Sequence, residues 1–214
     1  MIARRSLAFV VVAVLAGCQD DISTPFPAGL EPFDDDAKTL DLADTRDEML
    51  HARTTDSDMI RVYGRGFVLA APAVVYGVAH DPAVMIATCS TTSQTVTPDN
   101  DPAYELSFVV HYFVDNIVNV EWDDQWRGAV VDGTLDAPAL AMIKHQKIQG
   151  SDFITTSEGT IEVLATDDPA ITELRFVEHL DAVGGTPDDV VGGMQHNFDA
   201  LVAVSHGGAI PACP

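Results

Sequence analysis

The sequence predicts an α+β domain in which a curved antiparallel sheet of about seven strands wraps around one long C-terminal helix, with two short helices after the first strand. The stretch from Thr186 to Gly207 has the strongest helical pattern in the chain. Strand-like runs separated by short turn clusters fill most of the chain from 58 to 185. Because such a sheet must bury one face, we expect the C-terminal helix to cover it.

The C-terminal helix has clear start and stop signals. Thr186 is an N-cap residue, Pro187 occupies the first helical position, and Gly207 follows the last turn. The apolar residues of the helix recur at helical spacing and form one stripe: Val190, Val191, Met194, Phe198, Leu201 and Val202. This stripe is the face that we expect to lie on the sheet.

The strands are marked by β-branched and aromatic residues between turn clusters. Gly64 and Gly66 interrupt the first strand and predict a bend or a close approach of another element. Helix starts at Pro72 and at Asp81-Pro82 follow this strand. The short turns between the later strands predict an antiparallel meander. The expected strands cover 58–69, 93–97, 104–114, 117–131, 140–148, 153–165 and 171–183.

Residues 1–17 have the pattern of an export signal. Two arginines precede an apolar run from Leu7 to Ala16, which is too short to span a bilayer well. The stretch Leu15-Ala16-Gly17-Cys18 resembles the lipobox of bacterial lipoproteins, in which the signal is cut before a lipid-bearing cysteine. This resemblance implies a lipid anchor at Cys18 in the bacterial cell envelope. Gln19 differs from the aspartate that retains such proteins at the inner membrane, which favours the outer membrane. An ordinary secretory signal with an incidental cysteine is the alternative.

Beyond the signal, the chain divides into four parts. We expect a flexible acidic tether over 18–36, because this stretch is rich in proline and aspartate and has no sustained periodicity. The leading segment over 37–57 could form a short helix, because Leu40, Ala43 and Leu50 have helical spacing. The main domain covers 58–208, and a tail follows over 209–214.

The charge of the chain excludes one class of partner. Its 214 residues carry 33 acidic against 11 basic side chains, a formal net charge of -22. A nucleic-acid-binding protein needs a basic surface, which this composition does not supply. We expect a soluble, self-repelling surface instead.

The order of elements resembles the START-like (SRPBCC, helix-grip) superfamily. The residues that carry the resemblance are Val62-Tyr63-Gly64-Arg65-Gly66, Ala71-Pro72-Ala73-Val74-Val75, Asp81-Pro82 and Gly184-Gly185-Thr186-Pro187-Asp188-Asp189. The resemblance covers Asp58 to about Gly207. It implies a hydrophobic cavity between the sheet and the last helix, which members of the family use for lipids, sterols or other apolar molecules.

Several side chains are candidates to line that cavity. Glu178 shares the parity of Leu174, Phe176 and Leu180 on the last strand, so it points inward unless a bulge turns it outward. A buried carboxylate needs a partner or a raised pKa, and it could orient a ligand or act as an acid or base. The full candidate ligand-binding set is Phe108, Tyr112, Trp122, Phe176, Glu178, Met194 and Phe198. These aromatic residues could equally fill an ordinary core.

Two functions of different classes follow from these observations. The first is an envelope lipoprotein that binds a lipid-like small molecule, and the second is a structural or protein-interaction lipoprotein with a filled core. Catalysis ranks third, because the chain has no GxSxG, P-loop, GxGxxG or CxxC motif. The seven histidines show no metal-ligand spacing, so we expect no metal site and no cofactor.

Cys89 and Cys213 are the two cysteines that remain if Cys18 carries lipid. In an oxidising compartment such a pair tends to be joined. A disulfide would give the tail after the last helix a reason to be ordered, whereas two unpaired thiols are the alternative.

Overall fold

The computed structural model describes residues 21–41, 46–55, 58–86, 89–115 and 118–213. Cys18 and the signal segment lie outside these residues, as do Ala43 in the leading segment and Asn116 in the expected turn after Val114. No helix in the described ranges is long and apolar enough to cross a membrane.

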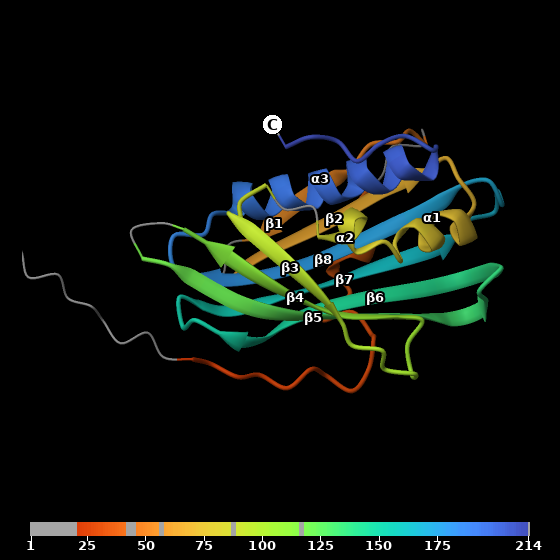
Figure 1. The fold of residues 1–214 in the computed structure, drawn as a ribbon. Coiled ribbons are helices and arrows are strands. Elements are labelled where there is room, and N and C mark those ends of the chain that lie inside the picture. Colours follow the sequence, from red (N-terminus) through yellow and green to blue (C-terminus); the bar gives the residue numbers. More distant parts are fainter. Residues whose placement is uncertain (1–20, 42–45, 56–57, 87–88, 116–117, 214) are drawn as a thin grey trace, which may run out of the picture.

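The described chain forms one eight-stranded antiparallel sheet with three α-helices on one face (Figure 1). The strand order is β1-β2-β8-β7-β6-β5-β4-β3, so the strands from β3 to β8 form a meander and β8 pairs with β2. This confirms the helix-grip arrangement. The strands are β1 His51–Thr55, β2 Ile60–Val68, β3 Ser93–Pro98, β4 Leu106–Val114, β5 Val120–Thr134, β6 Ala137–Gly150, β7 Ile154–Ala165 and β8 Thr172–Ala182.

Three α-helices lie on the concave face of the sheet: α1 Pro72–Val78, α2 Pro82–Met85 and α3 Pro187–Ser205. The start of α3 has the expected N-cap, in which the Thr186 hydroxyl accepts from the backbone N–H of Asp189 and the Asp189 carboxylate accepts from the Thr186 backbone N–H. Gly207, at a φ of 76°, adopts the left-handed conformation just after the helix.

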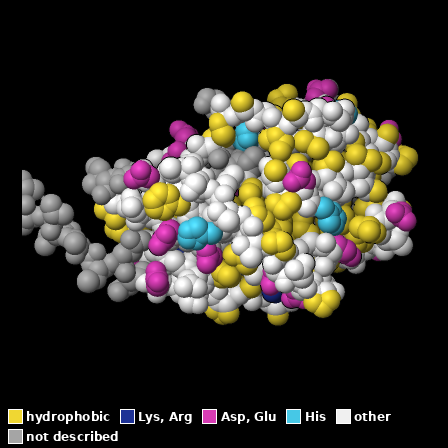
Figure 2. Space-filling model, in the orientation of Figure 1, with side chains coloured by type: hydrophobic (Ala, Val, Ile, Leu, Met, Phe, Trp, Pro, Cys, Tyr) yellow, Lys and Arg dark blue, Asp and Glu magenta, His cyan; other side chains and the backbone are white. Residues whose placement is uncertain are grey.

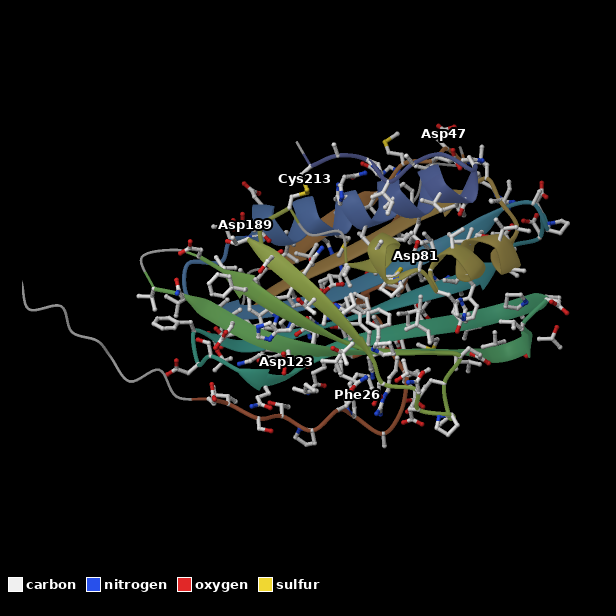
Figure 3. The ribbon with its side chains drawn as sticks, viewed as in Figure 1. Phe26, Asp47, Asp81, Asp123, Asp189 and Cys213 are labelled. Carbon is white, nitrogen blue, oxygen red and sulfur yellow. A yellow bond between two sulfur atoms is a disulfide. The ribbon has the colours of Figure 1, made fainter. Side chains whose placement is uncertain are left out.

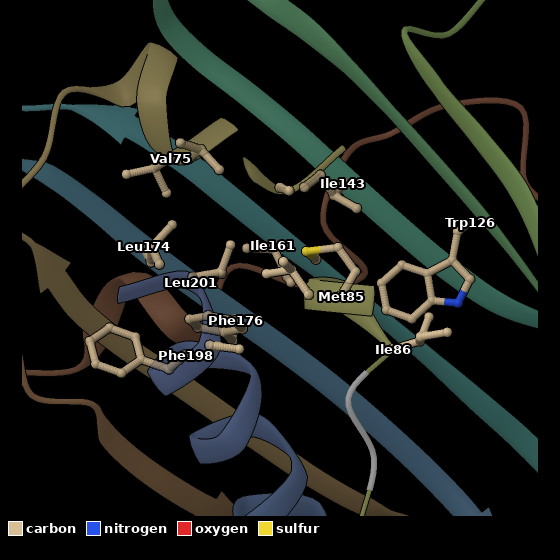
Figure 4. Close-up of a cluster of buried hydrophobic side chains, with 14 of the residues drawn as sticks. Val75, Met85, Ile86, Trp126, Ile143, Ile161, Leu174, Phe176, Phe198 and Leu201 are labelled. Carbon is tan, nitrogen blue, oxygen red and sulfur yellow. The ribbon is translucent and has the colours of Figure 1, made fainter. Parts of the chain in front are cut away.

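The main core lies between the helices and the concave face (Figure 4). Phe198 of α3 is buried and contacts Phe176 of β8 edge-to-face, with ring centroids 6.5 Å apart. Gly64 and Gly66 of β2 allow the close approach of α3. A Cβ on Gly64 would lie 2.4 Å from the sulfur of Met194, and one on Gly66 would lie 2.8 Å from the ring of Phe198. The expected close approach is therefore confirmed.

The prediction of a possible helix over 37–57 is wrong for most of the described residues in this range. A short 3-10 helix, η1, covers Asp36–Thr39, and β1 adds an eighth strand at the edge of the sheet by pairing with β2. The physical reason is that β2 would otherwise expose a row of unpaired backbone groups, which a neighbouring extended segment satisfies.

The described part of the expected tether, residues 21–36, packs on the convex face of the sheet, away from α3 (Figure 1). The backbone N–H groups of Ile22 and Thr24 donate to the carbonyls of Gly150 and Ile148, at the end of β6 where β7 has diverged. Phe26, labelled in Figure 3, lies 4.8 Å from the guanidinium of Arg127. This segment is therefore part of the domain, because β6 supplies free hydrogen-bonding groups and the convex face supplies side chains to pack against.

Candidate functional site

A cavity of about 200 Å³ lies between the first half of α3 and the concave face of the sheet. Its helix side is formed by Asp189, Val190, Gly193, Met194 and Asn197. Met85 of α2 and the following residues Ser90 and Thr91 close one side. The sheet side is formed by β4 to β8, near the end of the sheet where α3 begins. Its sheet residues are Tyr112, Trp122, Asp124, Trp126, His145, Ser157, Glu178, His179 and Leu180.

An ion pair between His145 and Glu178 lies in this cavity. The two residues are on β6 and β8, which are separated by β7, and both are in register with Gly159 of β7. The Nε2 atom of His145 lies 3.0 Å from Oε2 of Glu178. A Cβ on Gly159 would lie 2.4 Å from both groups, so the missing side chain at this position is what allows them to meet.

Asp124 of β5 lies on the other side of His145. Its Oδ2 atom is 3.7 Å from Nδ1 of His145, beyond hydrogen-bonding distance. Burial raises the pKa of Asp124, although His145 opposes that shift. Burial also lowers the pKa of His145, but Glu178 and Asp124 outweigh this effect and raise the pKa of His145 to about 10. The imidazole is therefore charged at neutral pH, with its Nε2–H bonded to Glu178 and its Nδ1–H facing Asp124 without a hydrogen bond.

Aromatic rings flank this polar cluster in two stacks. Trp126 lies between Phe108 and His145, with ring centroids 5.9 and 4.3 Å away. Trp122 stacks on Tyr112 at 5.0 Å. Five buried polar atoms of the cavity wall have no hydrogen-bond partner within the described chain: Nε1 of Trp122, Nε1 of Trp126, Oδ1 of Asp124, Nδ1 of His145 and Oδ1 of Asn197. Buried polar groups are normally paired, so these atoms mark a place where a ligand can bind.

The structure brings four of the seven candidate residues together at the cavity: Tyr112, Trp122, Glu178 and Met194. Glu178 points inward, as its parity on β8 predicts. Phe108, Phe176 and Phe198 belong to the buried core and do not line the cavity. They pack against other side chains because they lie deeper along the sheet or under the second half of α3.

Asp124 and His145 are site residues that the sequence reasoning missed. A usable signal exists for Asp124, because it shares parity with Trp122 and Trp126 and so must face inward with them. His145 has the parity of Ile143, which is also inward. His145 and His179 each contact two carboxylates.

The disulfide between Cys89 and Cys213 is present, with Cα atoms 5.4 Å apart. Cys213 lies beside α3 (Figure 3), so the bond ties the tail to the segment before β3. These two cysteines and His196 also form a group of potential metal ligands within 4.8 Å of one another. In the disulfide form the sulfurs are bonded to each other and are not thiolate ligands.

Comparisons with known proteins identify the fold. No family model matches the sequence, and no curated protein matches it. The STAR-related lipid transfer protein from Xanthomonas axonopodis superposes with a TM-score of 0.51 at 12% identity, over 73% of this chain and 93% of that chain. Human STARD10 superposes with a TM-score of 0.51 at 12% identity, over 78% of this chain and 74% of that chain. The chain therefore has the helix-grip fold of START-like proteins.

Proposed function

We propose that this protein is a lipid-anchored protein of the bacterial cell envelope whose START-like domain binds a small hydrophobic molecule between the sheet and α3. The observation that carries the proposal is the cavity with aromatic walls and buried polar atoms that lack partners. Its volume of about 200 Å³ is below the range of roughly 300–1,000 Å³ typical of ligand sites. The expected ligand is thus a small molecule, or one end of a longer one.

The glycines of α3 support this proposal. Gly192 and Gly193 lie inside the helix, where each glycine costs roughly 0.5–1 kcal/mol relative to alanine. Gly193 lines the cavity, and a Cβ built on it would meet no atom within 4 Å. A side chain at this position would extend into the cavity, so its absence keeps the space open.

Substitution of Gly193 tests ligand binding directly. In Gly193→Leu the new side chain should fill the cavity and weaken the binding of an environment-sensitive fatty probe with an uncharged head group by about tenfold or more. Gly192→Leu is the matched control, because this exposed neighbour does not line the cavity and also has free space around its Cβ. Equal binding by the two variants would favour the alternative, a structural or interaction lipoprotein without a ligand.

The envelope part of the proposal rests on the lipobox stretch Leu15-Ala16-Gly17-Cys18. Labelled palmitate should be incorporated into the wild-type protein but not into Cys18→Ala, which should leave the membrane fraction. Two or more acyl chains anchor a protein firmly, whereas one alone binds marginally. Unlabelled, freely soluble wild-type protein would rule out the anchor without affecting the cavity. Outer-membrane rather than inner-membrane placement is part of the proposal and is tested by membrane fractionation.

A further inference from the structure

The charged groups that line the cavity are mostly acidic. Asp124, Glu178 and Asp189 contribute carboxylates, and no Lys or Arg is among the described lining residues. His145 is the cation inside, and it is bound to Glu178. The other lining histidine, His179, bonds to Asp34 and Glu158 on the convex face. The cavity therefore offers its ligand acceptors and negative charge.

Asp124 is the acceptor that remains available. The residue is 3% exposed, and its Oδ1 atom has no hydrogen-bond partner within the described residues. Lys147 lies opposite Asp124 in the register of β5 and β6, but its ammonium donates to the carbonyl oxygens of Ser151 and Ile154. Neither nearby cation therefore forms a hydrogen bond to this carboxylate, although His145 lies 3.7 Å from its Oδ2 atom. Leaving the buried Oδ1 atom without a bond is costly.

The start of α3, where Asp189 lines the cavity, is acidic as well. Asp188 and Asp189 lie in the first turn of α3, where the capping box occupies the N–H of Asp189. These two carboxylates oppose the positive end of the helix dipole, which would otherwise favour an anion. The face that Figure 2 shows carries several acidic side chains and little Lys or Arg. A surface with such an excess of acidic side chains attracts cations and repels anions.

We infer that the cavity selects a small apolar amine, or the ammonium end of a larger molecule, with the ammonium at Asp124 and the hydrocarbon against Tyr112, Trp122 and Met194. This inference rests on the proposed binding function and names the ligand class. A fatty acid or other anion is disfavoured, because its carboxylate would lie among three carboxylates of the protein. A neutral alcohol could donate to Asp124 but would not be attracted by the charge.

Three ligands of equal chain length separate these classes: octylamine, 1-octanol and octanoate. The protein contains two tryptophans, Trp122 and Trp126, and both line the cavity, so intrinsic fluorescence reports binding without a label. Octylamine should bind about tenfold or more tightly than 1-octanol, and octanoate most weakly. The preference for octylamine should persist in 0.5 M salt. At this ionic strength the Debye length is about 3–5 Å, so attraction between exposed charges is screened, whereas a buried contact is screened much less.

Each other outcome has a definite meaning. Binding of 1-octanol or octanoate at least as tight as that of octylamine would overturn the amine inference and leave the binding function standing. No fluorescence change with any of the three, together with no binding of the fatty probe, would remove both. An amine preference that disappears in salt would show surface attraction only, and would also overturn the inference.

Two substitutions with the same charge change locate the amine. Asp124→Asn should remove the preference for octylamine over 1-octanol, because the amide does not carry the charge. Asp136→Asn is the control, since Asp136 is exposed in the turn between β5 and β6, at the opposite end of the sheet. Full amine preference in Asp124→Asn would overturn the inference. If that variant does not fold, the three-ligand series on the wild-type protein still decides.

Discussion

His145 of β6 and Glu178 of β8 form a hydrogen-bonded ion pair across a strand that lies between them. The backbones of strands that are two positions apart are separated by roughly 10 Å, yet Nε2 of His145 is 3.0 Å from the Glu178 carboxylate. Gly159 of β7 leaves the space in which the two side chains meet. The pair joins three strands on the concave face and forms the polar side of the cavity.

Gly159→Ala should separate this pair. The added methyl would overlap both the imidazole and the carboxylate, so one of them must move away from its partner. Breaking a buried ion pair costs about 3 kcal/mol or more, and partial exposure of Glu178 should place the loss near the lower end. Urea unfolding measures the loss. Gly192→Ala is the control and should be neutral or slightly stabilising, and equal stability of the two variants would contradict the role of Gly159.

The stability of the protein should depend on pH through His145. Burial lowers the pKa of His145, but the two carboxylates raise it to about 10, above the value of about 6.5 in an unfolded chain. Its contribution to stability is therefore complete below pH 6.5 and is lost as the pH rises toward 10. The free energy of unfolding of the wild type should fall over this interval.

His145→Gln provides the comparison for this pH effect. The variant should be less stable at neutral pH and should show a shallower decline above pH 6.5. Some decline should remain, because burial lowers the pKa of His179 while Glu158 and Asp34 raise it by more. Parallel curves for the variant and the wild type would show that His145 does not titrate as described.

The Cys89–Cys213 disulfide should contribute strongly to stability. It joins residues 124 positions apart, and closing so long a loop stabilises a protein by roughly 4–5 kcal/mol in the chain-entropy model. Reduction of the wild type should lower its free energy of unfolding by about that amount. The same reducing agent should not change the stability of Cys213→Ser, which lacks the bond. Two reactive thiols in denatured, unreduced protein, with Cys18 replaced by Ser, would exclude the bond.

The segment before η1 should behave as part of the folded domain. The amide protons of Ile22 and Thr24 are bonded to Gly150 and Ile148, so their hydrogen exchange should be slowed. Asp34 accepts from Tyr63 and His179, and Asp34→Asn should speed exchange in this segment by weakening both contacts. Exchange at the rate of an unfolded chain in the wild type would support a flexible tether instead.

Most of the fold could be predicted from local patterns. The cap at Thr186, the apolar stripe of α3 and the strand alternation each depend on neighbouring residues, so their positions agree with the structure. β1 was missed because His51–Thr55 is short and mostly exposed, and it is a strand only because β2 lies beside it. The packing of residues 21–36 was missed for a similar reason, since its contacts follow no period.

The candidate site was predictable only in part. Parity on one strand placed Glu178 inward, but its partner His145 depends on the pairing of three strands and on the glycine between them. Phe176 and Phe198 have the same local signals as the cavity residues Tyr112 and Trp122. The core residues differ from the cavity residues in how far along the sheet they lie. The periodic pattern of a sequence does not show that position.

The most direct test of a ligand in the cavity is native mass spectrometry of protein purified gently from its own cells. The wild type and Gly192→Leu should each carry the same additional small mass, which is released on unfolding. Gly193→Leu should lack it, because its side chain occupies the cavity. A bare chain mass for all three proteins, or the same additional mass on Gly193→Leu, would contradict the proposed binding function.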